Sequence, residues 1–365
     1  MPRIMKRAPL EIVTLRGTPL EVAYQLGRLR KGKISRVVEY WNRLLAARYR
    51  GRKSERLSLE RSFLQAAQRQ APHYLEEIFA MAEGAGVPWE ELFRLNITEL
   101  HIFAEKCSTL IFPIQTDRGH RMFVAHNEDW DSRRNDVFIL RAALPTVTYV
   151  VIAYDGYLPG LSSGINSFGL IHALNFLKPR DLRPRLPRIF VTRHMVTARN
   201  FSDCLRWIRQ TDRAFGQTIH LAQGSEYLGL EITARQMALR QPRLPTLHTN
   251  HYLAEELLPL ATAPSRSSWH RLMVGRDLLE RAIESNRGKP FTRNSASAVA
   301  RKILSDQSGL PYSIWREGDQ KADPGATVAT AFFGTDSNRI EVFRKKPLIS
   351  RPLRFDIPRE SEMGG

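Results

Sequence analysis

The protein has 365 residues, 42% of them hydrophobic, which is enough for one large domain or two ordinary ones with a real core. Its formal net charge of +18 is strongly basic, and its two cysteines exclude a disulfide framework. The sequence has no apolar run of signal-peptide or membrane-spanning length, so we expect a soluble protein of the cytoplasm, a reducing compartment.

The first 106 residues are predicted to be mainly helical. A short strand is expected at residues 10–15, followed by a turn at Arg16-Gly17-Thr18-Pro19. Apolar residues then recur at intervals of three and four, which predicts helices at 37–49, 57–68 and 74–82, and Pro88 opens another helix.

From Cys107 onward the pattern changes to strands that are interrupted by helices. A closing hairpin is predicted at 327–343, with its turn at 336–338. The other expected strands lie at 122–125, 146–154, 170–175, 217–222 and 227–232, and the expected helices at 187–197, 200–211, 267–284 and 295–305. Strands that meet in hairpins, with helices arriving in groups, favour an α+β fold over a doubly wound parallel sheet.

One segment stands out within this second part. Cys107 opens an apolar run, residues 116–120 supply a polar turn, and a second apolar run leads into Asn127-Glu128-Asp129-Trp130. A hairpin of that length would bring an acidic pair back beside the cysteine. The segment therefore indicates a reactive centre at Cys107.

The two cysteines have different surroundings. A free cysteine is most often a small buried apolar side chain, and Cys204, at helical spacing with Leu205 and Ile208, fits that description. Cys107 instead follows Lys106 and precedes Ser108 and Thr109.

Other catalytic chemistries find no support in the sequence. It contains no phosphate-binding loop, no HExxH, no GxSxG and no Cys/His spacing typical of zinc, and its ten histidines are scattered singly. We therefore predict neither a metal nor a cofactor, and Cys107 is the one plausible nucleophile.

Several short motifs occur together in a specific order. They are Arg16-Gly17-Thr18-Pro19, the helical stretch at 74–100, Cys107-Ser108-Thr109, Asn127-Glu128-Asp129-Trp130, GINSFGLIHALNF at 164–176, LHTNHYL at 247–253 and SRSSWHRL at 265–272. With them the chain resembles the autoproteolytic acyltransferases and hydrolases of the isopenicillin N acyltransferase type, which are N-terminal-nucleophile hydrolases. More distantly it resembles penicillin V acylase and bile salt hydrolase.

The resemblance implies an αββα sandwich in which the chain is cut between Lys106 and Cys107. Residues 1–106 would be a helical precursor segment and residues 107–365 the catalytic segment, the two together forming one compact domain. The cut would free the α-amino group of Cys107, so that a single residue supplies both the nucleophile and the base.

The same resemblance assigns further roles. Asp129 would hold the α-amino group, Asn250 and the backbone N–H of Asn175 would bind the oxyanion, and Arg271 would hold Cys107 or the substrate. Supporting positions are Asn127, Trp130 and Ser268.

Two residues depart from the family pattern. Lys106 stands where the penicillin acyltransferases have glycine, which bears on the efficiency of self-cleavage. His126 stands where bile salt hydrolases have arginine, which argues against the substrates of that subgroup.

The leading hypothesis is a self-processing amidohydrolase or acyltransferase that acts on linear N-acyl amide or acyl-thioester bonds through an acyl-enzyme at Cys107. Acyl-coenzyme A is compatible with the basic charge. The two fragments should remain associated, because the amphipathic helices of 1–106 cannot bury their apolar stripes alone.

Two alternatives stay open. In the first, the chain is uncut and Cys107 works with His126 or His251 as base. In the second, the protein binds polyanions without chemistry. Its basic stretches, at 28–36, 48–56, 178–188 and 344–354, are expected at helix ends or in proline-rich loops. They lack the interleaved aromatic residues of a nucleic-acid platform, so we predict no nucleic-acid and no membrane partner.

Overall fold

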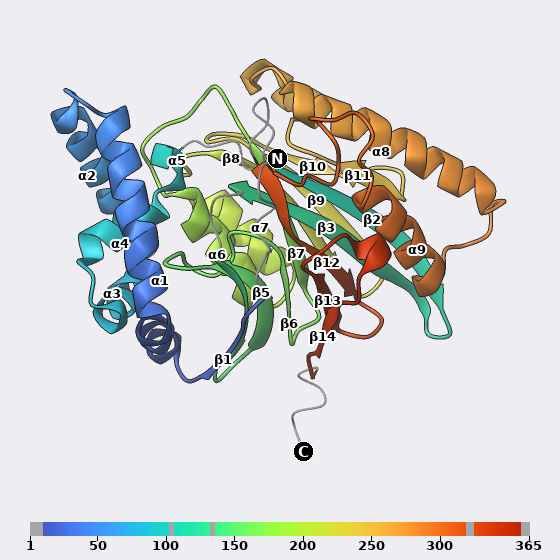
Figure 1. Ribbon diagram of the computed structural model, residues 1–365, viewed down its shortest axis with the longest axis horizontal. Helices are drawn as coiled ribbons and strands as arrows, with labels where there is room; N and C mark the ends of the chain where they lie inside the picture. The colour runs from blue at the N-terminus through green and yellow to red at the C-terminus, as the bar shows by residue number, and fades with distance from the viewer. Residues whose placement is uncertain (1–9, 102–105, 132–135, 319–324, 359–365) are drawn as a thin grey trace, which may run out of the picture.

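The computed structural model describes residues 10–101, 106–131, 136–318 and 325–358. Its centre consists of two stacked β-sheets, and helices cover the outer face of each sheet (Figure 1). This is the αββα layering of the predicted α+β fold, which is thereby confirmed.

The larger sheet has eight strands, and β1 is its one parallel edge. In spatial order they are β1 (Ile12–Arg16), β4 (Val137–Ala143), β5 (Thr148–Tyr154), β6 (Gly164–Asn166), β7 (Ile171–Leu177), β8 (Gly216–Gln223), β9 (Glu226–Ile232) and β10 (Met237–Arg240).

The smaller sheet has six antiparallel strands. In spatial order they are β11 (Thr246–His248), β2 (Lys106–Thr116), β3 (Gly119–Asp131), β12 (Gly325–Gly334), β13 (Arg339–Phe343) and β14 (Leu353–Asp356). The predicted closing hairpin is β12–β13.

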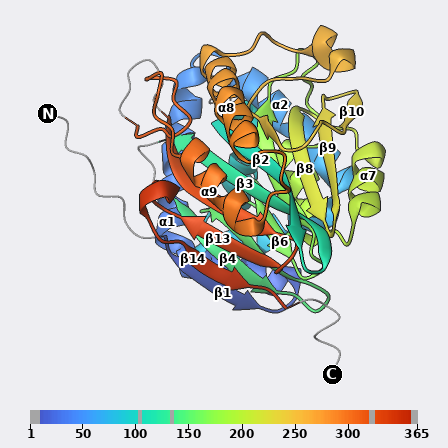
Figure 2. The same cartoon turned by 90° about the vertical axis from the view of Figure 1, so that its right-hand side faces the viewer.

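Two groups of helices flank the sheets. On the side of the larger sheet lie α1 (Pro19–Arg48), α2 (Lys53–Gln70), α3 (Pro72–Ala85), α4 (Trp89–Asn96), α5 (Thr98–His101), α6 (Arg188–Thr197) and α7 (Phe201–Gln210). On the outer face of the smaller sheet lie α8 (Arg266–Ser285) and α9 (Arg293–Leu304), which Figure 2 shows from the front. Two short 3-10 helices, η1 (Glu255–Leu260) and η2 (Pro347–Ile349), connect elements.

Side-chain alternation along β2 explains the layers. Leu110 and Phe112 pack into a core with Ala296 and Ala300 of α9, whereas Ile111 joins the larger core between the two sheets. Because successive side chains of a strand point to opposite faces, odd-numbered residues of β2 face the larger sheet and even-numbered residues face α8 and α9.

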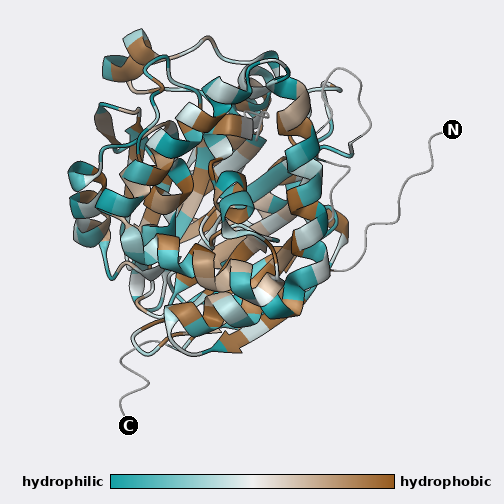
Figure 3. Ribbon diagram, turned by 90° about the vertical axis from the view of Figure 1, so that its left-hand side faces the viewer, coloured by the Kyte–Doolittle hydropathy of each residue, from teal (hydrophilic) through white to brown (hydrophobic). Residues whose placement is uncertain are grey.

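Helix α1 begins earlier than the predicted helix at 37–49. Pro19 occupies its first turn, and Thr18 caps it in a capping box with Glu21. The basic stretch 28–36 therefore lies inside α1 and not at a helix end, which corrects the expectation for that stretch. Hydrophilic and hydrophobic residues alternate along the helices on this side of the molecule (Figure 3).

Helices α1 and α3 cross at two glycines. A Cβ atom added at Gly27 would lie 2.1 Å from the Met81 carbonyl oxygen, and one added at Gly84 would lie 2.1 Å from the Tyr24 carbonyl oxygen. The two backbones can therefore approach this closely only where both residues lack a side chain.

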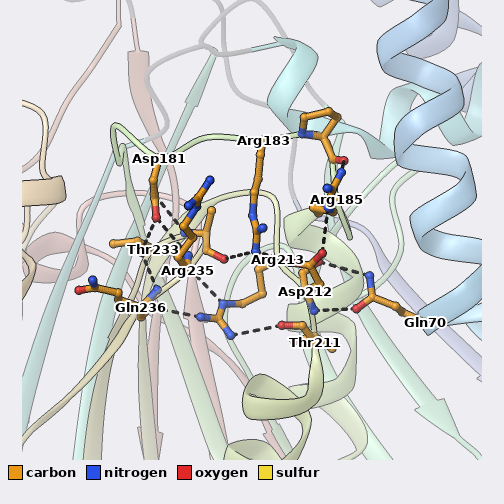
Figure 4. Close-up of polar contacts among 12 residues, drawn as sticks. Gln70, Asp181, Arg183, Arg185, Thr211, Asp212, Arg213, Thr233, Arg235 and Gln236 are labelled. Atoms are coloured by element: carbon orange, nitrogen blue, oxygen red, sulfur yellow. Dashed lines mark hydrogen bonds and ion pairs between the residues drawn. The ribbon is translucent and has the colours of Figure 1, made fainter.

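Polar contacts tie residues 10–101 to the rest of the chain. Arg193 of α6 donates to both carboxylate oxygens of buried Glu77 on α3, at 2.9 and 3.0 Å. Gln70 of α2 accepts from the Asp212 backbone nitrogen at 2.6 Å and donates to its carbonyl oxygen at 3.3 Å (Figure 4). Strand β1 adds backbone pairing with β4.

In the part of the chain that the structure describes, no helix combines the length and apolar character needed to cross a membrane.

Candidate active site

The β2–β3 hairpin places the acidic pair where the sequence predicted it. Lys106 pairs with Asp129 across the two strands, and Cys107 pairs with Glu128. Cys107 is buried, with 3% of its surface exposed. By strand alternation its side chain faces the larger sheet, as does that of Thr109, which bonds Asn175 on β7.

Two segments far along the chain hold the backbone of Cys107. The Cys107 nitrogen donates to Oδ1 of Asn250 at 2.8 Å, and Nη1 of Arg271 donates to the Cys107 carbonyl oxygen at 2.6 Å. Arg271 also donates to Asn250 Oδ1 at 2.7 Å and to Ser108 Oγ at 2.8 Å. The structure thus brings Cys107, Asn250 and Arg271 into one hydrogen-bonded group.

The two ends of the Asn250 side chain have different partners. Its oxygen, not its amide nitrogen, faces Cys107, and Nδ2 donates to the Phe176 carbonyl oxygen at 3.2 Å. An amide nitrogen carries two hydrogens, so one N–H is used by Phe176 and the second is left for another acceptor. Phe176 directly follows Asn175, so the side-chain amide of Asn250 lies beside the backbone that carries the other predicted oxyanion donor.

The segment that carries Asn250 is fixed at both sides. The Asn250 nitrogen donates to Ser268 Oγ at 2.8 Å, and Ser268 lies in the first turn of α8. The backbone nitrogens of Leu253 and Ala254 donate to Glu231 Oε2 at 2.8 and 2.9 Å. Burial opposes ionisation of Glu231, but hydrogen bonds from His248 and these neighbours outweigh it and lower its pKa to about 2.

Asp129 lies on the face of β3 that is turned away from the thiol. Its Oδ1 accepts from Thr327 Oγ1 at 2.7 Å, and its Oδ2 lies 3.9 Å from Nη1 of Arg316. Burial raises the pKa of Asp129, and the charges of Arg316 and Arg271 offset part of that rise. Asp129 is therefore beside the 106–107 peptide bond and not beside the sulfur.

The supporting residues have structural partners. Asn127 accepts from Thr330 Oγ1 at 2.6 Å and donates to the Leu304 carbonyl oxygen at 2.9 Å, which joins β3 to β12 and the end of α9. The ring of Trp130 lies 5.0 Å from that of Tyr154. The hairpin is thereby anchored on both of its faces.

On the thiol side, Cys107 has two neighbours that can exchange protons. The sulfur of Cys107, one ring nitrogen of His126 and one carboxylate oxygen of Glu128 all lie within 4.8 Å of one another. Glu128 accepts hydrogen bonds from Tyr154 Oη at 2.7 Å and Ser162 Oγ at 2.6 Å, and its Oε2 lies 3.0 Å from His126 Nε2.

His126 is also held from its other ring nitrogen, which lies 2.9 Å from Thr109 Oγ1. The three residue types could serve as transition-metal ligands, yet both ring nitrogens and both Glu128 oxygens have protein hydrogen-bond partners. His251 belongs to a different contact, with its Nδ1 2.7 Å from Ser268 Oγ. Of the two histidines considered as a base, His126 is the one in the thiol cluster.

Sequence reasoning missed part of this site. Thr327 and Arg316, the partners of Asp129, lie far along the chain. Thr327 begins the predicted closing hairpin but was given no role in the site, and Arg316 belongs to no motif named above. Glu128 stood inside Asn127-Glu128-Asp129-Trp130 but was not singled out. Its identity as a second carboxylate beside a cysteine and a nearby histidine was the signal that could have found it.

Cys204 is the contrasting case. It is fully buried in α7 within the main core, as predicted, and burial raises the pKa of its thiol to about 12. A thiol that is buried among apolar side chains, with its pKa raised in this way, is inert.

The family model described as acyl-coenzyme A:6-aminopenicillanic acid acyl-transferase matches residues 115–347. The chain belongs to this family. The matched range begins after Cys107 and includes His126, Asp129, Asn250 and Arg271. The predicted resemblance is confirmed at the level of the family.

Two curated proteins are similar over most of the chain. The β-alanyl-dopamine/carcinine hydrolase of Drosophila melanogaster is 23% identical, over 95% of this chain and 96% of that protein. The acyl-coenzyme A:6-aminopenicillanic-acid-acyltransferase 40 kDa form of Emericella nidulans is 26% identical, over 88% of each.

Solved structures give a weaker likeness. Penicillin V acylase from Agrobacterium tumefaciens is 13% identical with a TM-score of 0.45, over 68% of this chain and 86% of that one. A mutant conjugated bile acid hydrolase from Clostridium perfringens is 10% identical with a TM-score of 0.43, over 68% and 92%. The layers described above, and not these scores, define the fold.

Proposed function

We propose that this family member is a self-processing amidohydrolase or acyltransferase, with Cys107 as nucleophile after a cut between Lys106 and Cys107. The observation that carries the proposal is a pair of hydrogen bonds to the Cys107 backbone, one to Asn250 and one from Arg271. Every buried peptide group needs a hydrogen-bond partner. Here the partners are two polar side chains from separate segments, and they would set the attack angle of a nucleophile closely.

In the proposed turnover, the α-amino group of Cys107 takes the thiol proton and the thiolate attacks the substrate carbonyl carbon. An α-amino group has a pKa of about 8, so a useful fraction is unprotonated at neutral pH. Asn250 Oδ1, which now accepts from the amide nitrogen, would accept from the amine. Asp129, opposite Lys106, would face the charge that the new terminus brings.

The oxyanion would be bound by the second N–H of Asn250 and the backbone N–H of Asn175. Arg271 would fix the positions of Asn250 and Cys107 relative to each other, since it donates hydrogen bonds to both. The amine leaves with the proton from the α-amino group. Water or a second amine then releases the acyl group from sulfur.

The substrate class follows from the family and its two named relatives. One name describes a hydrolase of β-alanyl-dopamine and carcinine, and the other an acyltransferase using acyl-coenzyme A. We infer a linear N-acyl amide or an acyl thioester as the substrate here. The net charge of +18 suits an anionic carrier such as acyl-coenzyme A.

The cut would leave residues 1–106 and 107–365 as two polypeptides in one domain. The contacts of Arg193 with Glu77 and of Gln70 with Asp212 cross this division, as does the β1–β4 pairing. These contacts support the proposal that the fragments remain associated.

N-terminal sequencing and intact mass of the purified protein test the proposal. We expect a polypeptide that begins at Cys107, and Cys107→Ala should stay whole. Incubation with N-acyl amines, lactams and acyl thioesters should add an acyl mass to the fragment that begins at Cys107. A wild-type chain that stays whole and inactive toward all of these would refute the proposal.

A second candidate is an uncut hydrolase in which Cys107, His126 and Glu128 form a triad. The cluster of these three groups within 4.8 Å favours it. A whole chain that hydrolyses amides, and loses this activity in His126→Gln, would support the second candidate over the first.

A further inference from the structure

Self-cleavage lacks the base that the proposed turnover uses. Before the cut, the nitrogen of Cys107 is a peptide amide that donates to Asn250 Oδ1 at 2.8 Å. An amide nitrogen has no basic lone pair, so the base proposed for the mature enzyme does not yet exist. Some other group must take the thiol proton.

We infer that the His126–Glu128 pair is the base of the maturation step. This inference rests on the proposed self-cleavage and adds a residue role to it. His126 is fully buried and Glu128 is 3% exposed. Both side chains lie on the same face of the β2–β3 hairpin as the side chain of Cys107. A ring nitrogen of His126 and an oxygen of Glu128 lie within 4.8 Å of Cys107 and of each other.

Glu128 is held so that it can support a charged imidazole. It accepts two hydroxyl hydrogen bonds, from Tyr154 and Ser162, and these fix the position of its carboxyl group. Its Oε2, 3.0 Å from His126 Nε2, fixes the ring and stabilises the imidazolium that forms. The remaining separation from sulfur is one that a side-chain rotation or one water can close.

Each bond in the proposed step is accounted for. The S–H bond of Cys107 breaks, and its proton goes to the His126–Glu128 pair. Sulfur bonds to the Lys106 carbonyl carbon, the C–N bond to Cys107 breaks, and the pair returns the proton to the departing nitrogen. Water then hydrolyses the thioester, which leaves the Lys106 carboxylate and the free Cys107 thiol.

Burial of the pair suits this intramolecular reaction. The attacked carbonyl belongs to the residue next to Cys107, so no substrate has to enter. After the cut the α-amino group takes over as base, and His126 is no longer required for proton transfer. Maturation and turnover should therefore respond differently to changes at His126.

The test compares His126→Gln and Glu128→Gln with wild type and with His120→Gln, a matched change at an exposed position of the same strand. Intact mass follows the fraction cut over time. Turnover is then measured per cut molecule after long incubation, and circular dichroism verifies the fold. We expect the cutting rate of both buried variants to fall by about 10²-fold or more, the range of general-base catalysis. The cutting rate of both buried variants should fall by a clearly larger factor than their turnover per cut molecule, and His120→Gln should leave both quantities at the wild-type level.

The outcomes separate the two proposals. Wild type that is never cut refutes self-processing, and this inference with it. Wild type that is cut, with folded His126→Gln and Glu128→Gln cut equally fast, refutes this inference alone. Equal losses of cutting and of turnover per cut molecule refute it too, because they indicate a merely structural role. If His126→Gln does not fold, Glu128→Gln decides.

Discussion

Asn250 uses its two ends for different partners. Its oxygen receives hydrogen bonds from Cys107 and Arg271, while its nitrogen donates to Phe176. We predict that Asn250→Ala lowers kcat by about 10²- to 10³-fold, which is about 3 kcal/mol in the barrier. KM should change little, because an oxyanion donor acts mainly in the transition state.

Steady-state kinetics of the cut enzyme measure this. Asn250→Asp is the matched variant, since it keeps the oxygen acceptor and loses the N–H donor. Wild-type kcat in Asn250→Asp would show that the oxygen of Asn250 matters and that its N–H does not.

The second prediction concerns Asp129. Asp129→Asn should fold, yet be cut slowly and turn over slowly per cut molecule, because one carboxylate faces both the peptide bond and the later amine.

The raised pKa of Asp129 gives the sign of its effect on stability. Its contribution is greatest below the unfolded pKa of 3.8 and declines as pH rises through the higher folded pKa. Unfolding free energy measured from pH 3 to 8 should therefore decline less with pH in Asp129→Asn. Normal cutting and turnover in that variant would remove Asp129 from the mechanism.

The third prediction concerns Glu231, which holds the backbone after Asn250. Its pKa is lowered from 4.5 to about 2, so it stabilises the fold above pH 4.5 and that stabilisation is lost as pH falls toward 2. The shift corresponds to about 3 kcal/mol. Glu231→Gln should lose about this much at pH 7 and show a flatter acid profile in urea unfolding. Glu226→Gln, at an exposed position of the same strand, is the control.

The motifs of the family resemblance contain Cys107, Asp129, Asn250 and Arg271, and the structure brings Cys107, Asn250 and Arg271 together. The catalytic roles of these residues stay predictions. What could not be predicted was the direction of each contact. Whether Asn250 presents oxygen or nitrogen to Cys107 depends on Arg271 and Phe176, which arrive from separate elements.

At the scale of elements, the boundaries predicted from periodicity agree with the structure to a few residues for β7, β8, β9, α6, α7, α8 and α9. Helices α7, α8 and α9 bury one face, so their period is visible in the sequence. Strands β7 and β8 and helix α6 are buried at most positions, and turn residues at their ends mark them instead. The helix predicted at 37–49 is shorter than α1 because the basic stretch at 28–36 obscures the apolar period. Leu26 and Ile34 are buried on either side of Arg30, which is itself buried. The edge strands β10, β11 and β14 are three or four residues long, too short for a periodic pattern.

The fourth prediction belongs to the α1–α3 crossing. Gly27→Ala should destabilise the protein by about 1–3 kcal/mol, because the new methyl group would overlap the backbone of α3. Gly32→Ala is the matched control, since that glycine lies in the same helix and its nearest atom is Arg36 Nη1 at 3.9 Å. Alanine there should stabilise by about 1 kcal/mol through helix propensity. Thermal unfolding of both variants measures the contrast, and equal effects would refute close backbone contact at Gly27.

At the scale of the molecule, the interface between the two proposed fragments contains a buried ion pair. Arg193 and Glu77 are 2% and 4% exposed. Removing one partner leaves the other charge buried without compensation, which typically costs about 3–5 kcal/mol.

We therefore predict that Glu77→Gln weakens the association of the cut fragments. Dilution followed by gel filtration should separate them at concentrations where the wild-type fragments co-elute. Glu39→Gln, in an exposed pair with Arg43 on α1, is the control and should leave co-elution unchanged. Fragments of Glu77→Gln that stay together as tightly as wild type would contradict the prediction.

Strand β1 belongs to the segment before the proposed cut, yet it forms the parallel edge of the larger sheet beside β4. While the chain is whole, this edge assembles within one molecule, and refolding is a first-order process at any concentration. Once the chain is cut, the same edge must be found by a separate polypeptide, so refolding becomes second-order. After unfolding and dilution, the two chains of the mature protein would therefore not readily reassemble the β1–β4 edge of the sheet. Its lifetime would depend on how slowly it unfolds rather than on how well it refolds.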